Sequence, residues 1–278
     1  MPANHKGDSP SHAGEHYTHG HHESVLKSHT WRTVDNSVAY LVPHLEPGLS
    51  VLDLGCGPGT ITADLAGRVA PGRVIGLDAA PEIIEKASAF AADAGIVNVE
   101  FVTGDAYQLD YPDDNFDIVH AHQILQHVVD PVAVLREARR VVKREGIVAA
   151  RDADYAGVIW YPLLPGLARW LSLYERVHRS NGGEPNAGRH LKAWAMGAGF
   201  TDVQSTASIW CFTSDEDREW WGSMWEERVL ESAFAEDAMK KGLATQGDLN
   251  EISAAWREWA EHPAAWLAMP HGEILCRG

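Results

Sequence analysis

Residues 51–60, Val-Leu-Asp-Leu-Gly-Cys-Gly-Pro-Gly-Thr, decide the fold of this chain. Their first four positions form an apolar-rich run, of the kind that builds a buried parallel strand. Three glycines follow, and they let the backbone turn sharply and approach a ligand without a Cβ in the way. The next segment shows helical spacing, with apolar side chains at Ile61, Leu65, Ala66 and Val69. The N–H groups at the start of such a helix point back at the turn, which predicts a nucleotide-type site at a strand-to-helix corner.

The spacing of the glycines argues against two common types of nucleotide-binding site. A dinucleotide-binding fingerprint has glycines at its first, third and sixth positions, whereas Thr60 stands at the sixth position here. No Lys-Ser/Thr pair follows the turn, which argues against a phosphate-cradling P-loop. Asp53 lies inside the motif, where its charge would repel a pyrophosphate. The same charge would favour a ligand that carries an ammonium and a sulfonium.

Three further strand-like segments follow, and each leads into polar or small residues. Residues 73–78 end in Asp78, which precedes Ala79, and a carboxylate at this place can accept both ribose hydroxyl protons. The other two are residues 99–106, which end in Gly104, Asp105 and Ala106, and residues 116–123, a fourth strand with an exit loop that contains His122 and Gln123.

These four segments, in this order, resemble motif I and the following motifs of the class I S-adenosylmethionine (SAM) methyltransferases. The resemblance is closest to the branch of ubiquinone/menaquinone-biosynthesis and sterol C-methyltransferases. It extends from Trp31 to Asp152, and residues 125–131 carry much of it. It implies SAM as the cofactor, S-adenosylhomocysteine (SAH) as its product, and an acidic contact from Asp105 to the adenine amino group.

On this basis we expect the cofactor to be bound by Tyr17, Arg32, Asp53, Gly55, Gly57, Asp78, Ala79, Gly104, Asp105, Ala106, His122 and Gln123. Tyr17 is expected to close over the methionine end, and Arg32 to meet the methionine carboxylate by a charge-assisted bond. A surface aromatic and a helix-face cation are the alternatives for these two residues.

The segments predict an α/β, Rossmann-like class I methyltransferase fold. Strands alternate with helices as far as residue 154, which calls for a parallel sheet with right-handed crossovers. We expect a seven-stranded, mostly parallel sheet with an antiparallel last strand and helices on both faces. The expected parts are a flexible His-rich arm or lid at 1–30, a SAM-binding core at 31–154, and a remainder at 155–278 that completes the sheet and carries helical insertions at 155–185 and 214–262.

Both insertions leave the carboxyl ends of strands, where ligands bind in open α/β sheets, so they should act as lids over the substrate. A sixth strand is expected at 202–212 and a last one at 264–276, with Thr213 and Glu216 as the capping box of the helix between them. Seven of the 11 tryptophans lie in the insertions. Such residues more often pack than bind, yet their number favours an apolar or aromatic, cation-tolerant acceptor. The expected substrate-binding residues are Trp160, Tyr174, His178, Trp221 and Trp225.

Seven of the 15 histidines fall within the first 29 residues. Imidazoles at this density can bind a divalent cation, but they can equally belong to a solvated arm or a hydrogen-bonded lid. We favour the arm or lid and expect no metal site, because no cysteine or clear acidic ligand pattern accompanies the histidines.

Composition excludes several classes of function. Acidic residues outnumber basic ones by 39 to 23, for a formal charge of −16, which disfavours nucleic-acid substrates. Three cysteines without a CxxC pattern indicate neither a disulfide framework nor a zinc ribbon. No apolar run reaches the length of a membrane span and no signal peptide opens the chain, so we expect a soluble, cytoplasmic protein. Homo-oligomerisation is left open.

The chemistry of methyl transfer is an in-line displacement, in which the enzyme aligns the acceptor and the methyl group and excludes water. A hydroxyl acceptor, or a carbon acceptor after attack, also needs a proton acceptor. The candidates are His122, His127 and Asp152, with His120 and Asp154 nearby, because neutral imidazole accepts protons near pH 7. Structural roles are the alternative for each. Residues 122–125 read His-Gln-Ile-Leu, which differs from the Asn/Asp-Pro-Pro-Tyr signature of amino-methylating enzymes acting on nucleic acids and proteins.

Together these observations predict a SAM-dependent methyltransferase that acts on a hydrophobic small molecule, such as a secondary metabolite or an isoprenoid or aromatic compound. One alternative is a C-methyltransferase that methylates a prenyl alkene and forms a carbocation, with or without a coupled cyclisation. A second alternative is a non-catalytic SAM-binding partner of another protein.

Overall fold

The computed structural model describes residues 30–277. Within that range one sheet of eight strands has the order β3-β2-β1-β4-β5-β8-β6, and β7 pairs with β8. The strands are β1 (Ser50–Leu54), β2 (Arg73–Asp78), β3 (Val99–Thr103), β4 (Phe116–His122), β5 (Val142–Ala153), β6 (Ile159–Tyr161), β7 (Asp202–Phe212) and β8 (Trp266–Arg277). The first five strands pair in parallel, and β8 runs antiparallel to β5, β6 and β7. The predicted α/β fold with an antiparallel last strand is confirmed.

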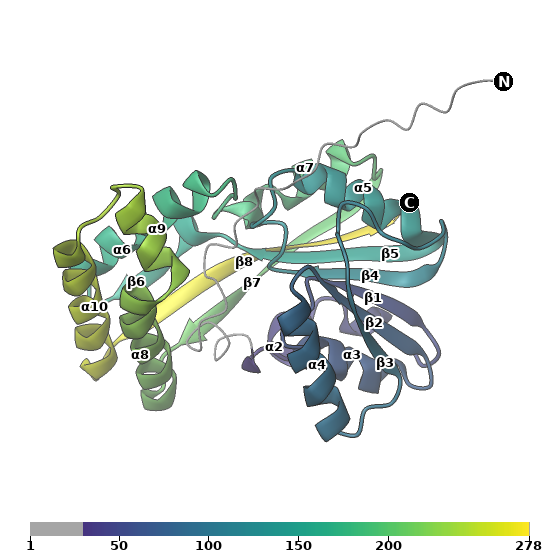
Figure 1. Cartoon of the computed structure of the whole chain (residues 1–278), viewed down its shortest axis with the longest axis horizontal. Helices are drawn as coiled ribbons and strands as arrows, with labels where there is room; N and C mark the ends of the chain where they lie inside the picture. The colour runs from purple at the N-terminus through teal and green to yellow at the C-terminus, as the bar shows by residue number, and fades with distance from the viewer. Residues whose placement is uncertain (1–29, 278) are drawn as a thin grey trace.

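Helices cover both faces of this sheet and build a separate helical lobe (Figure 1). They are α2 (Val34–Ser37), α3 (Thr60–Val69), α4 (Pro81–Asp93), α5 (Pro131–Val141), α6 (Pro165–Ser180), α7 (Leu191–Gly197), α8 (Asp215–Glu231), α9 (Ala233–Lys240) and α10 (Gln246–Glu261). In α5 the Asp130 carboxylate accepts from the Ala133 N–H at 2.9 Å and so caps the start of the helix, where Pro131 is the first residue. Pro81 likewise begins α4.

Apolar residues form one core on each face of the sheet and a third in the helical lobe. Leu65 of α3 packs with Val51 and Ile118 on one face, and Leu135 of α5 packs with Leu52 and Val119 on the other. This alternation along β1 explains why both faces need helices. The core of the lobe is rich in aromatic residues, and its fully buried side chains include Trp170, Trp225, Trp256, Trp259, Tyr174 and Phe234.

The long strands β7 and β8 connect the two parts, because both continue from the sheet toward the helical lobe (Figure 1). Trp210 and Phe212 of β7 and Leu267 and Met269 of β8 contribute to the core of the lobe. The second insertion, residues 214–262, is therefore joined to the sheet through the continuous strands β7 and β8 rather than through linkers.

The structure differs from the sequence prediction at four places. The helical spacing of Val34, Val38, Leu41 and Val42 predicts one helix within 32–45, whereas the structure has two short pieces, α2 and a 3₁₀ helix at Val42–His44. The run Lys143-Arg144-Glu145-Gly146 predicts a turn before a fifth strand at 147–153, but β5 begins already at Val142. The first insertion adds β6 as an eighth strand. The fourth difference is the cap of α8, which lies one residue later than predicted.

The cap of α8 is formed by Ser214 and Asp217 and not by Thr213 and Glu216. The Ser214 hydroxyl accepts from the Asp217 N–H at 3.1 Å, and the Asp217 carboxylate accepts from the Ser214 N–H at 3.3 Å. Both frames place an acidic residue three positions after a hydroxyl residue, so the sequence alone fits either register.

Substituting Ser214→Ala should therefore lower the free energy of unfolding by about 1 kcal/mol, the usual cost of losing an N-cap hydroxyl. Thr213→Ala is the matched control, and its effect should stay within about 0.5 kcal/mol. Denaturant unfolding of the two variants measures both effects, and a larger loss from Thr213→Ala would contradict the observed cap.

Candidate active site

A cavity of about 380 Å³ opens where the carboxyl ends of β1, β2 and β4 meet the helical lobe. Its size lies in the range of small-molecule sites. All the predicted cofactor-binding residues except Tyr17 line it, together with His127 and Trp221. Tyr17 and the His-rich arm lie outside the described residues.

The glycine turn after β1 forms one wall of this cavity. Gly55, Gly57 and Gly59 have φ angles of 65°, 54° and 86°, a region that favours glycine because it lacks a Cβ. A Cβ on Gly59 would lie only 2.8 Å from the Phe101 ring. A side chain at any of these positions would therefore strain the backbone, and the glycines keep the turn open to the cavity.

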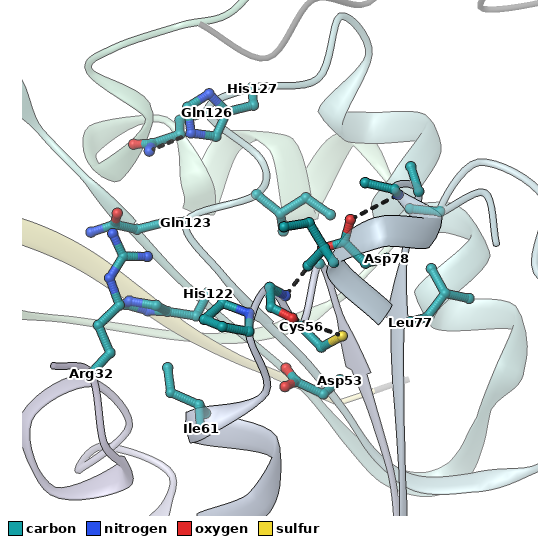
Figure 2. A pocket seen from close by; sticks show the side chains of 18 of the residues that line it. Arg32, Asp53, Cys56, Ile61, Leu77, Asp78, His122, Gln123, Gln126 and His127 are labelled. Atoms are coloured by element: carbon teal, nitrogen blue, oxygen red, sulfur yellow. Dashed lines mark hydrogen bonds between the residues drawn. The ribbon is translucent and has the colours of Figure 1, made fainter. Parts of the chain in front are cut away.

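The Asp78 carboxylate fastens that turn to the end of β2. Its Oδ2 accepts from the Gly57 N–H at 3.1 Å, and its Oδ1 accepts from the Ala80 N–H at 3.1 Å. These bonds fix the orientation of the carboxylate beside the turn, as Figure 2 shows. Each oxygen still has lone-pair capacity for a ligand hydroxyl.

Asp53, by contrast, uses both carboxylate oxygens in contacts with buried protein side chains at the base of the cavity. Its Oδ1 lies 2.7 Å from Nδ1 of His120, and its Oδ2 accepts from the Thr62 hydroxyl at 2.6 Å. Asp53 and His120 are both buried. The network links β1, α3 and β4, so this acid contributes to the rigidity of the site as well as to its negative potential.

His122 lies at the carboxyl end of β4, between Asp53 and the guanidinium of Arg32 (Figure 2). Its side chain is 7% exposed, and neither ring nitrogen has a hydrogen-bond partner among the described residues. Burial, followed by the charges of Arg151 and Arg32, holds the pKa of His122 well below its ordinary value. The ring is therefore a neutral imidazole with an available lone pair.

Gln123 follows with a positive φ of 53°, and two bonds hold it there. Its N–H donates to the Arg151 carbonyl at 2.8 Å, and its side-chain amide donates to Nε2 of His271 at 2.9 Å. Nδ1 of His271 in turn donates to the Met269 carbonyl at 3.1 Å. Sequence reasoning missed His271, because 148 residues separate it from Gln123 and no local pattern relates them.

His127 also faces the cavity, but its ring is already engaged. The Gln126 amide nitrogen donates to Nε2 of His127 at 3.0 Å, as the dashed line in Figure 2 shows. Burial, followed by the charges of His178 and Arg32, holds the pKa of His127 well below its ordinary value. His122 is consequently better placed than His127 to accept a proton from a ligand.

Asp152 lies behind the wall that carries His127 and is not among the residues that line the cavity. It is completely buried, and its Oδ1 accepts from the Gln126 N–H at 3.0 Å. Burial raises the pKa of Asp152 to about 8, although the Gln126 N–H acts in the opposite direction. Its position favours a role in holding the loop after β4.

The predicted substrate-binding residues divide between the cavity and the core of the lobe. Trp221 lines the cavity, whereas Trp225 and Tyr174 belong to the buried core and Trp160 packs against it. His178 donates from Nε2 to the Gln126 carbonyl at 2.7 Å, behind the wall. The cavity is lined instead by residues that the sequence analysis did not single out, among them Tyr155, Trp210, Arg228 and Met269.

Comparisons with known proteins agree with this geometry. A family model described as a methyltransferase domain matches residues 45–203. An uncharacterized methyltransferase of Schizosaccharomyces pombe is 33% identical over 270 residues, which cover 93% of this chain and 95% of the relative.

The chain belongs to the SAM-dependent methyltransferases.

The predicted resemblance to the menaquinone branch is confirmed as well. A demethylmenaquinone methyltransferase of Lactococcus lactis is 37% identical over 128 residues, which cover 46% of this chain and 48% of the relative. The solved structure of the YcgJ protein of Bacillus subtilis has a TM-score of 0.55 and 19% identity, and the match covers 86% of this chain and 97% of YcgJ. This likeness supports the class I Rossmann-like fold. As in the family, SAM is the cofactor.

No helix in residues 30–277 is long and apolar enough to cross a membrane. In the same range, no three His, Cys, Asp or Glu side chains come together as a metal-binding group. Neither observation extends to the His-rich arm.

The protonation of Asp152 gives a testable pH dependence. With its pKa raised from 3.8 to about 8, the native protein retains a proton that the unfolded chain loses above about pH 4. The stability contributed by this group is therefore complete below pH 3.8 and is lost as the pH rises through about 8.

Asp152→Asn keeps an oxygen acceptor for the Gln126 N–H but removes the titration. The stability of the wild type relative to this variant should therefore fall between pH 5 and pH 9. Thermal unfolding at a series of pH values measures the difference, and a constant difference across that range would contradict a buried, protonated Asp152.

Proposed function

We propose that this methyltransferase transfers the methyl group of SAM to a hydrophobic small molecule held against the helical lobe. The observation that carries the proposal is the single cavity that extends from the glycine turn to the side chains of Tyr155, Trp221 and Met269. A cofactor bound at the turn and an acceptor bound beside the lobe would share one enclosed space, from which water is excluded.

We assign the cofactor to the side of the cavity formed by β1, β2 and their loops. Asp78 would accept the ribose hydroxyls, because its carboxylate is held beside the open backbone of Gly57. Asp105, at the end of β3, would face the adenine. Arg32 would bind the methionine carboxylate, with its guanidinium 5.5 Å from the centre of the Trp210 ring. In this arrangement the sulfonium lies toward His122.

His122 would act on the acceptor as a hydrogen-bond and proton acceptor. Methyl transfer to a hydroxyl removes the positive charge of the sulfonium and releases a proton, so a neutral imidazole can take that proton without increasing the net charge of the site. The burial that keeps His122 neutral also keeps its lone pair available. His127 and Asp152 would position the loop after β4.

The helical segments at 165–180 and 215–261 would act as the acceptor lid, and the parts 31–154 and 155–278 as the cofactor-binding and acceptor-binding portions of one enzyme. In the prenyl-alkene alternative, the carbocation would form in the same cavity, beside Tyr155 and Trp221. A non-catalytic SAM-binding partner would have no need of an enclosed acceptor space.

Incubation with methyl-labelled SAM and a panel of phenols, naphthols and aromatic acids tests the proposed function. We expect label in an organic-extractable product with at least one aromatic acceptor. Tight SAH binding without transfer to any of the panel would favour the non-catalytic alternative.

Asp78→Ala should weaken SAH binding at least about tenfold, because the ribose loses a charged acceptor and the glycine turn loses its anchor. Asp110→Ala is the matched control, since Asp110 is exposed and does not line the cavity. Isothermal titration measures both affinities. Unchanged binding by the Asp78 variant would contradict the assignment of the ribose site.

His122→Asn should reduce the turnover of a hydroxyl acceptor about a hundredfold, the usual contribution of a general base. The affinity for SAH should change much less, because the main cofactor contacts remain. Single-turnover rates and titration with SAH separate the two effects. Equal losses in rate and cofactor affinity would show that His122 binds the cofactor rather than serving the chemistry.

A further inference from the structure

Gln123 has an uncommon backbone conformation at the wall of the cavity. Its φ of 53° lies in the left-handed region, which residues other than glycine adopt only at a cost in free energy. Its N–H donates to the Arg151 carbonyl of β5 at 2.8 Å, and its side chain lines the cavity and is half-buried. Strain of this kind is concentrated at functional sites, so Gln123 is a candidate for a direct contact with a ligand.

The ring of His271, which holds the Gln123 side chain, has a defined tautomer. His271 lies on β8 and is completely buried, with its ring centre 4.2 Å from that of Trp210. Its Nδ1 lies 3.1 Å from the Met269 carbonyl oxygen, and because a carbonyl can only accept, Nδ1 carries a proton. Burial, followed by the charges of Arg151 and Arg32, holds the pKa of His271 well below its ordinary value. The ring is therefore neutral, and its Nε2 carries a lone pair.

This tautomer determines the orientation of the Gln123 amide. The amide nitrogen lies 2.9 Å from Nε2 of His271, and since that ring nitrogen can only accept, the amide must present an N–H to it. The opposite orientation would place the amide oxygen against a lone pair, with no proton between them. Oε1 is therefore the other end of the planar amide, and no group within residues 30–277 donates to it. A carbonyl oxygen on a side chain that lines the cavity is thus open to a ligand.

The position of Gln123 places this oxygen near both proposed ligands. Gln123 directly follows His122, the group proposed to accept a proton from the methyl acceptor. In the view of Figure 2 its side chain lies between the Gln126–His127 pair and the guanidinium of Arg32, the group proposed for the cofactor carboxylate. An amide carbonyl binds hydrogen-bond donors and offers nothing to a group that only accepts.

We propose that His271 is a positioning residue: it holds the Gln123 amide so that its carbonyl oxygen accepts a hydrogen bond from an O–H or N–H group of a ligand in the cavity. This inference rests on the proposed function and adds a requirement for the ligands. The donor can come from the amino group of the cofactor or from the methyl acceptor, since both would lie in this cavity.

Two pairs of probes distinguish these sources, and isothermal titration measures all the affinities. The first pair is SAH and 5′-S-(3-carboxypropyl)-5′-thioadenosine, which is SAH without its amino group. The second pair is 2,3-dihydroxynaphthalene and 2-naphthol, added to SAH-saturated protein. In at least one pair we expect the probe with the additional donor to bind the wild type about fivefold or more tightly, as one hydrogen bond implies.

His271→Phe should reduce that preference to about onefold, because the ring still packs on Trp210 but no longer orients the amide. Gln123→Met should have the same effect, since it keeps the length of the side chain and removes the carbonyl. Gln123→Met also leaves His271 in place, so it tests the carbonyl even where His271→Phe does not fold. Circular dichroism establishes which variants are folded.

A rescue experiment separates positioning from a merely structural role of His271. Glutamate has an oxygen on both branches of its terminal group and needs no partner to orient it. Gln123→Glu should therefore restore the preference in the His271→Phe background. His262→Phe is the matched control, because His262 precedes the same strand, packs on Tyr161 and does not line the cavity. This variant should retain the wild-type preference.

The outcomes separate this inference from the proposed function. Sensitivity of the SAH pair to the variants would assign the donor to the cofactor, and sensitivity of the naphthol pair would assign it to the methyl acceptor. A wild type without either preference, a preference that survives His271→Phe or Gln123→Met, or a failed rescue would overturn the role of His271. The proposed function would still stand in those cases if labelled methyl is transferred to an aromatic acceptor. Failure of the wild type to bind SAH would instead contradict the assignment of the cofactor side.

Discussion

The tight turn after β1 is the constraint on which the rest of the site depends. Three glycines with positive φ bring the chain from the end of a buried strand directly into α3. A Cβ would lie 3.0 Å from the Ile124 side chain at Gly55 and 2.8 Å from the Phe101 ring at Gly59. The Gly57 N–H donates to Asp78, so the turn of one strand and the acid at the end of the next are held as one unit. That unit defines the cofactor side, and every other group in the cavity is placed relative to it.

The cofactor side of the cavity could be predicted from the sequence, because the carboxyl ends of parallel strands lie at one edge of the sheet. Asp78 and His122 end apolar strands and Asp105 follows one closely, so their sequence positions already imply that they meet. No comparable rule predicts which residues of the helical lobe border the cavity. Trp221 and Trp225 are one turn apart on α8, yet the first lines the cavity and the second is buried in the core. Helical periodicity identifies a buried face without showing which part of it borders a ligand.

Long-range polar contacts escaped prediction for a related reason. His271 supports Gln123 from β8, and the Trp210 indole donates to the Asn36 carbonyl across 174 residues of sequence. Such pairs depend on the register of β8 against its neighbours, which no local pattern specifies. The one-residue shift in the cap of α8 has a simpler origin, because two hydroxyl residues, Thr213 and Ser214, both precede acidic residues at capping-box spacing.

We propose that the reacting centre lies at His122, between the cofactor side of the cavity and the acceptor side formed by the helical lobe. A crystal structure of the SAH complex is the most direct test of this placement. We predict the ribose hydroxyls at Asp78, the amino-acid carboxylate at Arg32, and the sulfur facing His122 with open space toward Tyr155 and Trp221. A sulfur that points away from His122, or an SAH molecule that fills the space beside Trp221, would contradict the division of the cavity into a cofactor side and an acceptor side.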